Sequence, residues 1–310
     1  MTSSLKGNFQ IKPCLHSIGY AGVWRGQARL TLDQFLLKAK ELGFSSVMLM
    51  AKRPHLSPLD YDQAARKKLK ARLDELGLTL AGLAGYSDFT AGIDKSGIPN
   101  VEIQAAYVGE VARLAHDLGC PMVRVFTGYE RPGVPYEVQY AAVVEGLQLA
   151  GQEAAKHGVT LAVQNHHDIA LHHEAMLWLM KDVNLPNVKV GWDAWSPTVQ
   201  GMTTEEIRQS ILKMKPYLVN TIAAQYVRQP RYHYNSDLIN YTRQDDLLRA
   251  TSMTNPEGII DYKSFVATLR QIGYRGSIVY EMCAVLDGGG SIENLDRKAR
   301  EFMKFLQQEK

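Results

Sequence analysis

Short apolar segments alternate with longer amphipathic segments along almost the whole chain. The apolar segments span four to six residues and stand between glycine-containing or polar stretches. Segments of this length and composition are typical of buried strands. They predict eight strands, at residues 15–20, 46–50, 79–83, 122–126, 161–164, 188–192, 221–226 and 278–281.

The segments between these strands repeat apolar residues at intervals of three and four, which is the pattern of a helix with one buried face. Gly43, Gly77, Gly119, Gly158 and Gly273 each follow a helical segment and precede a predicted strand. Glycine is favoured there because the residue that ends a helix often adopts a left-handed conformation. The predicted helices cover residues 32–42, 62–76, 101–118, 136–156, 174–180, 204–214, 262–272 and 292–308.

Eight strand–helix units in one chain predict an α/β fold, a single (β/α)8 TIM barrel over residues 1–310. Most connections are short, but residues 86–100 and 227–258 form extended loops after the third and seventh strands. In a parallel barrel, the loops that follow the strands form the active-site face. We therefore expect both extended loops to border the ligand pocket.

The composition is typical of a soluble globular protein, with 45% hydrophobic and 22% charged residues. The net charge of +3 is too small to indicate a nucleic-acid partner, and no run of apolar residues is long enough to predict a membrane span. The N-terminal residues lack the apolar core of a secretory signal. Cys14, Cys120 and Cys283 are widely spaced and form no CxxC motif, which favours a reducing, cytoplasmic location.

Three predicted strands end in polar side chains: Gln164, Asp193 and Glu281. Strand side chains alternate between the two faces, so these residues can point into the barrel mouth together. His166 and Gln225 stand near the ends of the fifth and seventh strands. Oxygen and nitrogen donors of this kind suit a divalent ion, Mn²⁺ first and Mg²⁺, Co²⁺ or Zn²⁺ as alternatives. The sequence thus predicts a metal site formed by Gln164, Asp193, Gln225, Glu281 and His166, although Asp193 could instead cap the turn that follows it.

Aromatic and basic residues near the predicted strand ends are candidates for substrate binding. Aromatic faces and hydrogen-bonding side chains suit a sugar, and basic side chains suit a phosphate or carboxylate. Loop salt bridges are the alternative explanation for the basic residues. The predicted substrate-binding residues are Lys52, Tyr129, Trp195, Arg228 and His233.

Three segments carry a resemblance to a known family. The segment Gly-Val-Thr-Leu-Ala-Val-Gln-Asn-His, which ends at His166, resembles the fifth-strand motif of xylose isomerase-like TIM barrels. Val-Gly-Trp-Asp and Val-Tyr-Glu resemble the sixth- and eighth-strand motifs of the same family, the group of sugar phosphate isomerases/epimerases. The resemblance covers nearly the whole chain. It implies that Asp193 and Glu281 bind a metal ion and that Glu281 moves protons.

Two positions depart from the family pattern. Gln164 stands where the fifth-strand motif normally has Glu, and the segment 220–226 contains no His to match a seventh-strand ligand. An amide oxygen can bind a metal, but an amide is no base, so a proton cannot pass between two glutamates here. A histidine has an ordinary pKa suited to that task. The predicted catalytic residues are therefore His166, His167 and Glu281.

The leading hypothesis is a divalent-metal-dependent sugar isomerase or epimerase that abstracts a proton next to the carbonyl of a sugar or keto-sugar. One alternative is a lyase similar to the C-glycoside deglycosidases, which would carry out β-elimination from a 3-oxo-glycoside. Another is a non-catalytic sugar-binding barrel with a decayed metal site. An apurinic-endonuclease-like barrel is disfavoured by the low net charge and sparse ligand set. We expect a small-molecule carbohydrate as substrate, no nucleic-acid or membrane partner, and assembly as a homo-oligomer or as a subunit of a hetero-complex.

Overall fold

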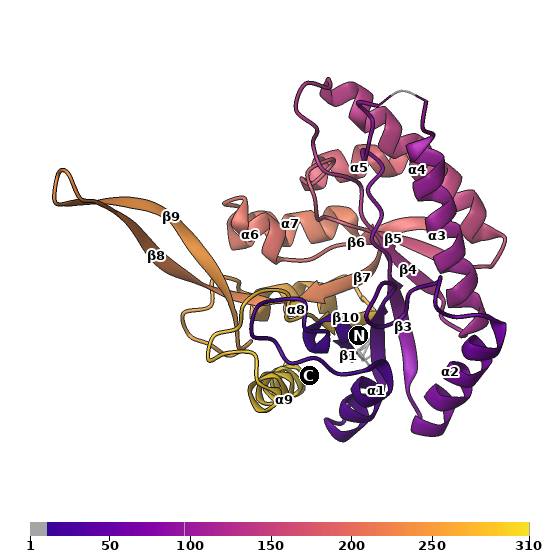
Figure 1. The fold of residues 1–310 in the computed structure, drawn as a ribbon, viewed down its shortest axis with the longest axis horizontal. Helices are drawn as coiled ribbons and strands as arrows, with labels where there is room; N and C mark the ends of the chain where they lie inside the picture. Colours follow the sequence, from indigo (N-terminus) through magenta and orange to yellow (C-terminus); the bar gives the residue numbers. More distant parts are fainter. Residues whose placement is uncertain (1–10, 96, 310) are drawn as a thin grey trace, which may run out of the picture.

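The computed structural model describes residues 11–95 and 97–309. Within them, eight parallel strands close into a barrel in the order β1-β10-β7-β6-β5-β4-β3-β2 (Figure 1). The predicted TIM barrel is therefore confirmed. The barrel strands are β1 (Lys12–His16), β2 (Ser46–Met50), β3 (Thr79–Ala84), β4 (Met122–Val125), β5 (Thr160–Gln164), β6 (Val188–Gly191), β7 (Leu218–Ala223) and β10 (Ser277–Tyr280).

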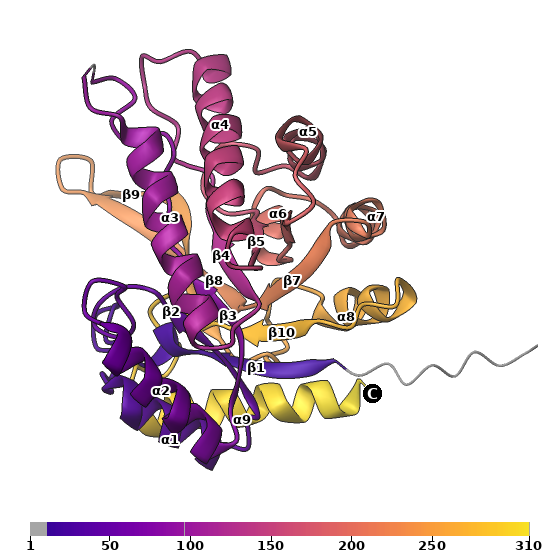
Figure 2. The ribbon, with the colours of Figure 1, turned by 90° about the vertical axis from the view of Figure 1, so that its right-hand side faces the viewer.

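Helices surround the barrel strands (Figure 2). Thr31 and Thr203 each begin a helix with a capping box, in which a side chain three residues on returns a hydrogen bond to the threonine N–H. Gly77 ends another helix with φ 64°, which agrees with the role predicted for the recurrent glycines. The helices are α1 (Leu32–Glu41), α2 (Gln63–Leu76), α3 (Asn100–Asp117), α4 (Tyr136–Ala155), α5 (His173–Val183), α6 (Trp195–Val199), α7 (Thr204–Met214), α8 (Tyr262–Gln271) and α9 (Ile292–Gln308).

Alternate residues of the strands fill two separate cores. Outward residues such as Leu161 and Val163 pack against the helices, whereas inward residues form a second cluster inside the barrel. This inner cluster consists of Cys14, Met48, Ala84, Met122, Ala162, Ile222 and Val279. The next inward positions lie at the carboxyl ends of the strands. The alternation therefore directs Arg124, Gln164 and Glu281 to the barrel mouth.

Two predicted strands differ from the observed ones. The segment predicted as a strand at 15–20 splits into β1 and a 3-10 helix, η1 (Ser17–Tyr20). The chain turns there because the His16 ring accepts a hydrogen bond from the Ile18 N–H, and the Ser17 hydroxyl accepts one from Met50. The strand predicted at 221–226 ends earlier, at Ala223.

The extended loop predicted at 227–258 is largely an antiparallel hairpin. Its strands, β8 (Gln225–Asn235) and β9 (Asn240–Thr251), pair with each other and project away from the barrel (Figure 1). At the tip, Asn235 accepts hydrogen bonds from two backbone N–H groups, which is a local turn signal. Most of the hairpin is exposed on both faces, so its side chains follow no single-sided hydrophobic pattern. No helix in the described parts of the chain is both long and apolar enough to span a membrane.

Candidate active site

A cavity of about 430 Å³ opens at the carboxyl ends of the barrel strands. This is the face on which TIM barrels carry their active sites. Aromatic rings form much of its wall, and six acidic, basic or histidine side chains line it as well. The aromatic residues are Trp24, Tyr86, Phe126, Tyr129, Trp195 and Tyr226, and the others are Lys52, Asp88, Arg124, His166, His167 and Glu281.

Glu281 directly follows β10 and occupies the inward position after Val279. Its backbone N–H donates to the carbonyl of Ala223 on β7, which fixes the chain at this point. The side chain is 9% exposed, and burial raises its pKa above the ordinary value, while the positive charges of Arg124 and Lys52 act in the opposite direction. The predicted placement of this carboxylate at the barrel mouth agrees with the structure.

Arg124 was not predicted as a site residue. It stands on β4, opposite β10 in the ring of eight strands, and its side chain is 1% exposed. One guanidinium nitrogen donates to the Gly85 carbonyl, and the group lies 3.9 Å from the centre of the Phe126 ring. The sequence signal was an arginine at an inward position of an apolar strand, the same kind of signal that identified Glu281.

Lys52 follows β2 and provides the second cation of the cavity. Its ammonium lies 3.7 Å from the centre of the Tyr86 ring, a cation–π contact. Burial and the neighbouring Arg124 lower its pKa, and Glu281 raises it. Neither cation has a carboxylate oxygen within 4.0 Å among the residues that the structure describes. The cavity therefore holds two cations and the Glu281 carboxylate without a direct ion pair, whereas its other carboxylate, Asp88, pairs with Arg131.

The two adjacent histidines after β5 are both neutral near pH 7. The pKa of His166 is lowered to about 3 and that of His167 to about 4, and burial is the largest cause of both shifts. Nδ1 of His166 accepts the backbone N–H of His167 at 2.8 Å, so the proton of the neutral ring resides on Nε2. The His167 ring packs between Phe126 and Tyr129, with centroid distances of 4.2 and 4.0 Å. His166 is thus arranged as a hydrogen-bond donor rather than as a base.

Asp193 and Gln164 interact with each other outside the lining of the cavity. The Gln164 amide donates to one Asp193 oxygen at 2.9 Å, and the backbone N–H of Ser196 donates to the other at 2.9 Å. Asp193 is 0% exposed, and burial raises its pKa to about 7 despite these hydrogen bonds. Asp193 therefore has the alternative role of a turn cap, because the N–H group that it accepts belongs to the first turn of α6.

Besides Gln164 and Asp193, three further residues predicted for the site do not line the cavity. The Gln225 amide oxygen accepts the backbone N–H groups of Tyr226 and Ile260, and its nitrogen donates to the Ile260 carbonyl. Arg228 and His233 lie on the exposed hairpin, because β8 leads the chain away from the barrel. The other predicted substrate-binding residues, Lys52, Tyr129 and Trp195, do line the cavity.

The donor groups do not fit a divalent metal ion. Within residues 11–95 and 97–309, no three His, Cys, Asp or Glu side chains lie close enough together to hold one. Both Asp193 oxygens already accept N–H donors, and Glu281 shares its cavity with Arg124 and Lys52. Two resident cations repel a third positive charge. The structure thus does not assemble the five residues predicted as metal ligands.

Cys283, two residues beyond Glu281, lies in the cavity wall. Its sulfur lies 2.7 Å from the Tyr226 hydroxyl, close enough for a hydrogen bond. Burial raises the pKa of this thiol well above its ordinary value. A thiol that stays protonated is a weak nucleophile, so we assign Cys283 to the wall of the site.

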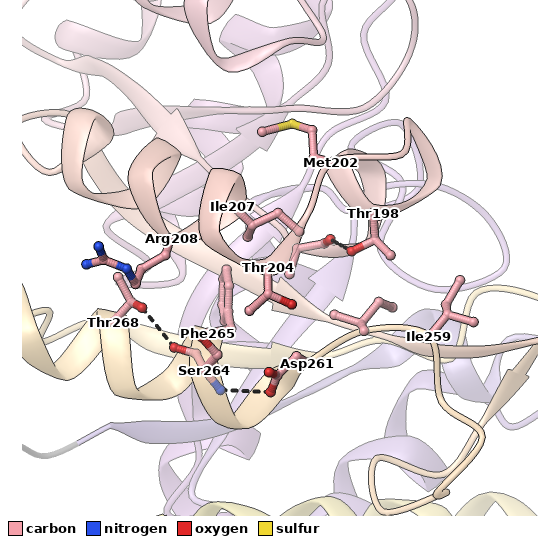
Figure 3. A pocket seen from close by; sticks show the side chains of 12 residues that line it. Thr198, Met202, Thr204, Ile207, Arg208, Ile259, Asp261, Ser264, Phe265 and Thr268 are labelled. Carbon is pink, nitrogen blue, oxygen red and sulfur yellow. Dashed lines mark hydrogen bonds between the residues drawn. The ribbon is translucent and has the colours of Figure 1, made fainter.

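A smaller cavity of about 50 Å³ lies between α7 and α8 (Figure 3). Its two charged residues have local roles: Asp261 accepts the Ser264 N–H at the start of α8, and Arg208 pairs with Glu205. The remaining lining is made of apolar and hydroxyl side chains. This cavity is a packing gap in the outer helical layer and brings no free polar groups together.

Comparisons with solved structures agree with this fold. D-Psicose 3-epimerase from Clostridium cellulolyticum, solved with D-tagatose, gives a TM-score of 0.71 at 16% identity, over 96% of this chain and 99% of its own. D-Allulose 3-epimerase from a Methylomonas species, in complex with D-allulose, gives 0.69 at 18% identity, over 97% and 98%. The probable 3-DHS dehydratase AsbF from Bacillus anthracis gives 0.69 at 15% identity, over 96% and 99%.

These identities are low, so the three structures establish the likeness of fold alone. No curated protein matches the sequence. The family model described as xylose isomerase-like TIM barrel matches residues 36–309, which is most of the chain. The resemblance inferred from the three strand-end segments is thereby confirmed, and the chain belongs to the xylose isomerase-like TIM barrel family.

Proposed function

We propose that the protein is a sugar isomerase/epimerase-type enzyme that moves a proton on the carbon next to the carbonyl of a keto-sugar. The observation that carries this proposal is the position of Glu281, a largely buried carboxylate that faces the cavity without a direct ion pair. Burial without neutralisation is a costly arrangement, and it strengthens a carboxylate as a base. The similar structures named as 3-epimerases of psicose and allulose support the substrate class.

In the proposed reaction, the Glu281 carboxylate removes the proton from the carbon next to the carbonyl. The electrons of that C–H bond form the carbon–carbon double bond of an enediolate, and the carbonyl oxygen takes the negative charge. The Nε2–H of His166 donates a hydrogen bond to this oxygen. Return of the proton from Glu281 to the former carbonyl carbon, together with transfer of the hydroxyl proton of the first carbon to the former carbonyl oxygen, gives isomerisation. In epimerisation, water in the open cavity delivers a proton to the opposite face of the first carbon, the carbonyl re-forms, and Glu281 releases its proton to solvent.

The two cations help to keep the base ionised. Burial raises the pKa of Glu281, which favours the protonated, inactive form, and the charges of Arg124 and Lys52 offset part of this shift. The result is a carboxylate that is more basic than one in water. We derive no step through a metal ion, because the donor set does not fit one.

Proton exchange in D₂O tests the proposal. The protein is incubated with a panel of keto-sugars and 3-oxo-glycosides, in EDTA and in added Mn²⁺, and deuterium at carbon is measured by NMR. We expect exchange next to a carbonyl in both media. Release of the aglycone from a 3-oxo-glycoside would favour the lyase alternative, which begins with the same proton removal. No exchange with any compound in either medium would favour a non-catalytic sugar-binding barrel.

A further inference from the structure

In the described parts of the chain, Arg124 and Lys52 have no direct counter-ion, whereas another buried arginine of this protein has one. Arg66, which is 4% exposed, donates to a carboxylate oxygen of Asp117 at 2.7 Å. Arg124 is 1% exposed and contacts a carbonyl and aromatic rings instead of a carboxylate. Its Nε is buried without a hydrogen-bond partner among the described residues. The Arg124 guanidinium therefore has no carboxylate to balance its charge and one N–H group without an acceptor.

Both cations face the same cavity as Glu281, and they face it from different strands. Arg124 belongs to β4 and Lys52 follows β2, with only β3 between these strands in the ring. Glu281 follows β10, on the opposite side from Arg124. Asp88, which follows β3, also lines the cavity but is paired with Arg131. The unpaired charge of the cavity is therefore positive on the β2–β4 side and negative on the β10 side.

We propose that Lys52 and Arg124 form an anion subsite, and that the substrate is a keto-sugar with a carboxylate or phosphate group. The proposal rests on the proposed function in that it places a sugar in the same cavity. The anionic group binds between the two cations and neutralises them. The negative charge of Glu281 repels that group, so the carbonyl end of the sugar lies toward Glu281 and His166.

Three compounds with one carbon skeleton separate the possibilities: D-fructose, D-fructuronate and D-fructose 6-phosphate. Their binding is measured by calorimetry in EDTA at low ionic strength, and deuterium exchange is followed in parallel. We expect at least one of the two anionic compounds to bind roughly tenfold more tightly than D-fructose, in line with the strength of charge-assisted hydrogen bonds. The arm that gains affinity identifies the group as carboxylate or phosphate.

Two variants and a control connect this preference to the proposed subsite. R124M and K52M should each bring the affinity for the anionic compound down to that for D-fructose. R53M removes the same charge from an exposed residue that pairs with Asp60, and should leave the preference unchanged. Should R124M fail to fold, K52M carries the test, because Lys52 is only partly buried and ends in the cavity.

Equal affinity for all three compounds, no binding of any of them, or a preference that survives in K52M and R124M would overturn the proposal. The parallel exchange measurement separates this inference from the proposed function. Exchange without an anion preference would refute the subsite alone. An anion preference without exchange, unchanged in E281Q, would support the subsite and refute the proton transfer.

Discussion

The side-chain amide of Gln164 donates a hydrogen bond to the carboxylate of Asp193 at 2.9 Å. The fifth-strand motif of the family normally has a glutamate at the first of these positions, where two carboxylates would share a cation. With an amide, one N–H group satisfies the Asp193 oxygen directly. The second oxygen holds the first turn of α6, so this carboxylate has become part of the support of the site.

We predict that D193N retains deuterium exchange within a few-fold of the parent protein. Asparagine keeps the oxygen that accepts the Ser196 N–H. The Gln164 amide can turn over, so that its oxygen, which has no partner in the structure, accepts from the new amide. D193A, which loses both hydrogen bonds, is the control and should be less stable by about 1–3 kcal/mol. Loss of exchange in a well-folded D193N would instead point to Asp193 as a metal ligand.

D193N should also change how stability depends on pH. Burial raises the pKa of Asp193 from 3.8 to about 7, so the folded protein holds this proton more tightly than the unfolded chain does. The resulting contribution to stability is fully present below pH 3.8 and is lost as the pH rises through about 7. Denaturant unfolding from pH 4 to 8 should therefore show a decline in the parent protein that D193N lacks. Parallel curves for the two proteins would contradict the assignment.

E281Q tests the base directly. Glutamine preserves the shape of the side chain but cannot accept a proton, so we expect exchange to fall by about 10²- to 10⁴-fold. Far-ultraviolet circular dichroism and the denaturation midpoint establish that the barrel is intact. E301Q makes the same chemical change on α9, at a residue that does not line the cavity, and serves as the control. Exchange at the parental rate in E281Q would remove Glu281 from the mechanism.

The sequence predicted the barrel and the carboxylate of the site for the same reason, the alternation of side chains along strands. Gln164 and Glu281 follow inward residues of the inner cluster, Ala162 and Val279, at a spacing of two. The same rule applied to Met122 would have identified Arg124. The hydrogen bond from Gln164 to Asp193 could not be predicted, because it depends on rotamers and on the depth of burial rather than on spacing.

The hairpin escaped prediction for a different physical reason. A strand is recognised when one face is buried, because apolar and polar residues then alternate. In β8, the side chains of Tyr232 and His233 are both exposed, so neither face carries a consistent apolar pattern. This element is defined by pairing between strands, for example of Arg228 with Leu248, which are twenty residues apart in the sequence. A local sequence pattern does not reveal such pairing.

H166F should lower the exchange rate without changing how that rate depends on pH. Phenylalanine preserves ring packing against Trp195 and Phe126 but removes the Nε2–H donor, and loss of one such donor typically costs about 10²-fold or more. Because the pKa of His166 is about 3, the ring remains neutral from pH 5 to 8 in the parent protein. Rate profiles of both proteins should therefore have the same shape over that range. A limb near pH 6 to 7 that disappears in H166F would indicate that this histidine acts as the base.

Removal of the outer hairpin should change association but not the barrel. Leu238 and Ile239 at its tip are 73% and 80% exposed. Between residues 229 and 247 the two strands pair with each other, whereas Ala250 at the base of β9 also bridges to Leu286. An isolated two-stranded hairpin is only marginally stable, and exposed apolar side chains favour contact with another molecule. We expect a variant in which Asn-Gly replaces residues 229–247, between the paired Arg228 and Leu248, to unfold and to exchange deuterium as the parent protein does.

Sedimentation of this variant should then report a smaller assembly than the parent chain forms. L238S/I239S is the matched control that keeps the hairpin, and it should weaken the assembly in the same direction. Equal masses for all three proteins would show that the hairpin does not mediate self-association.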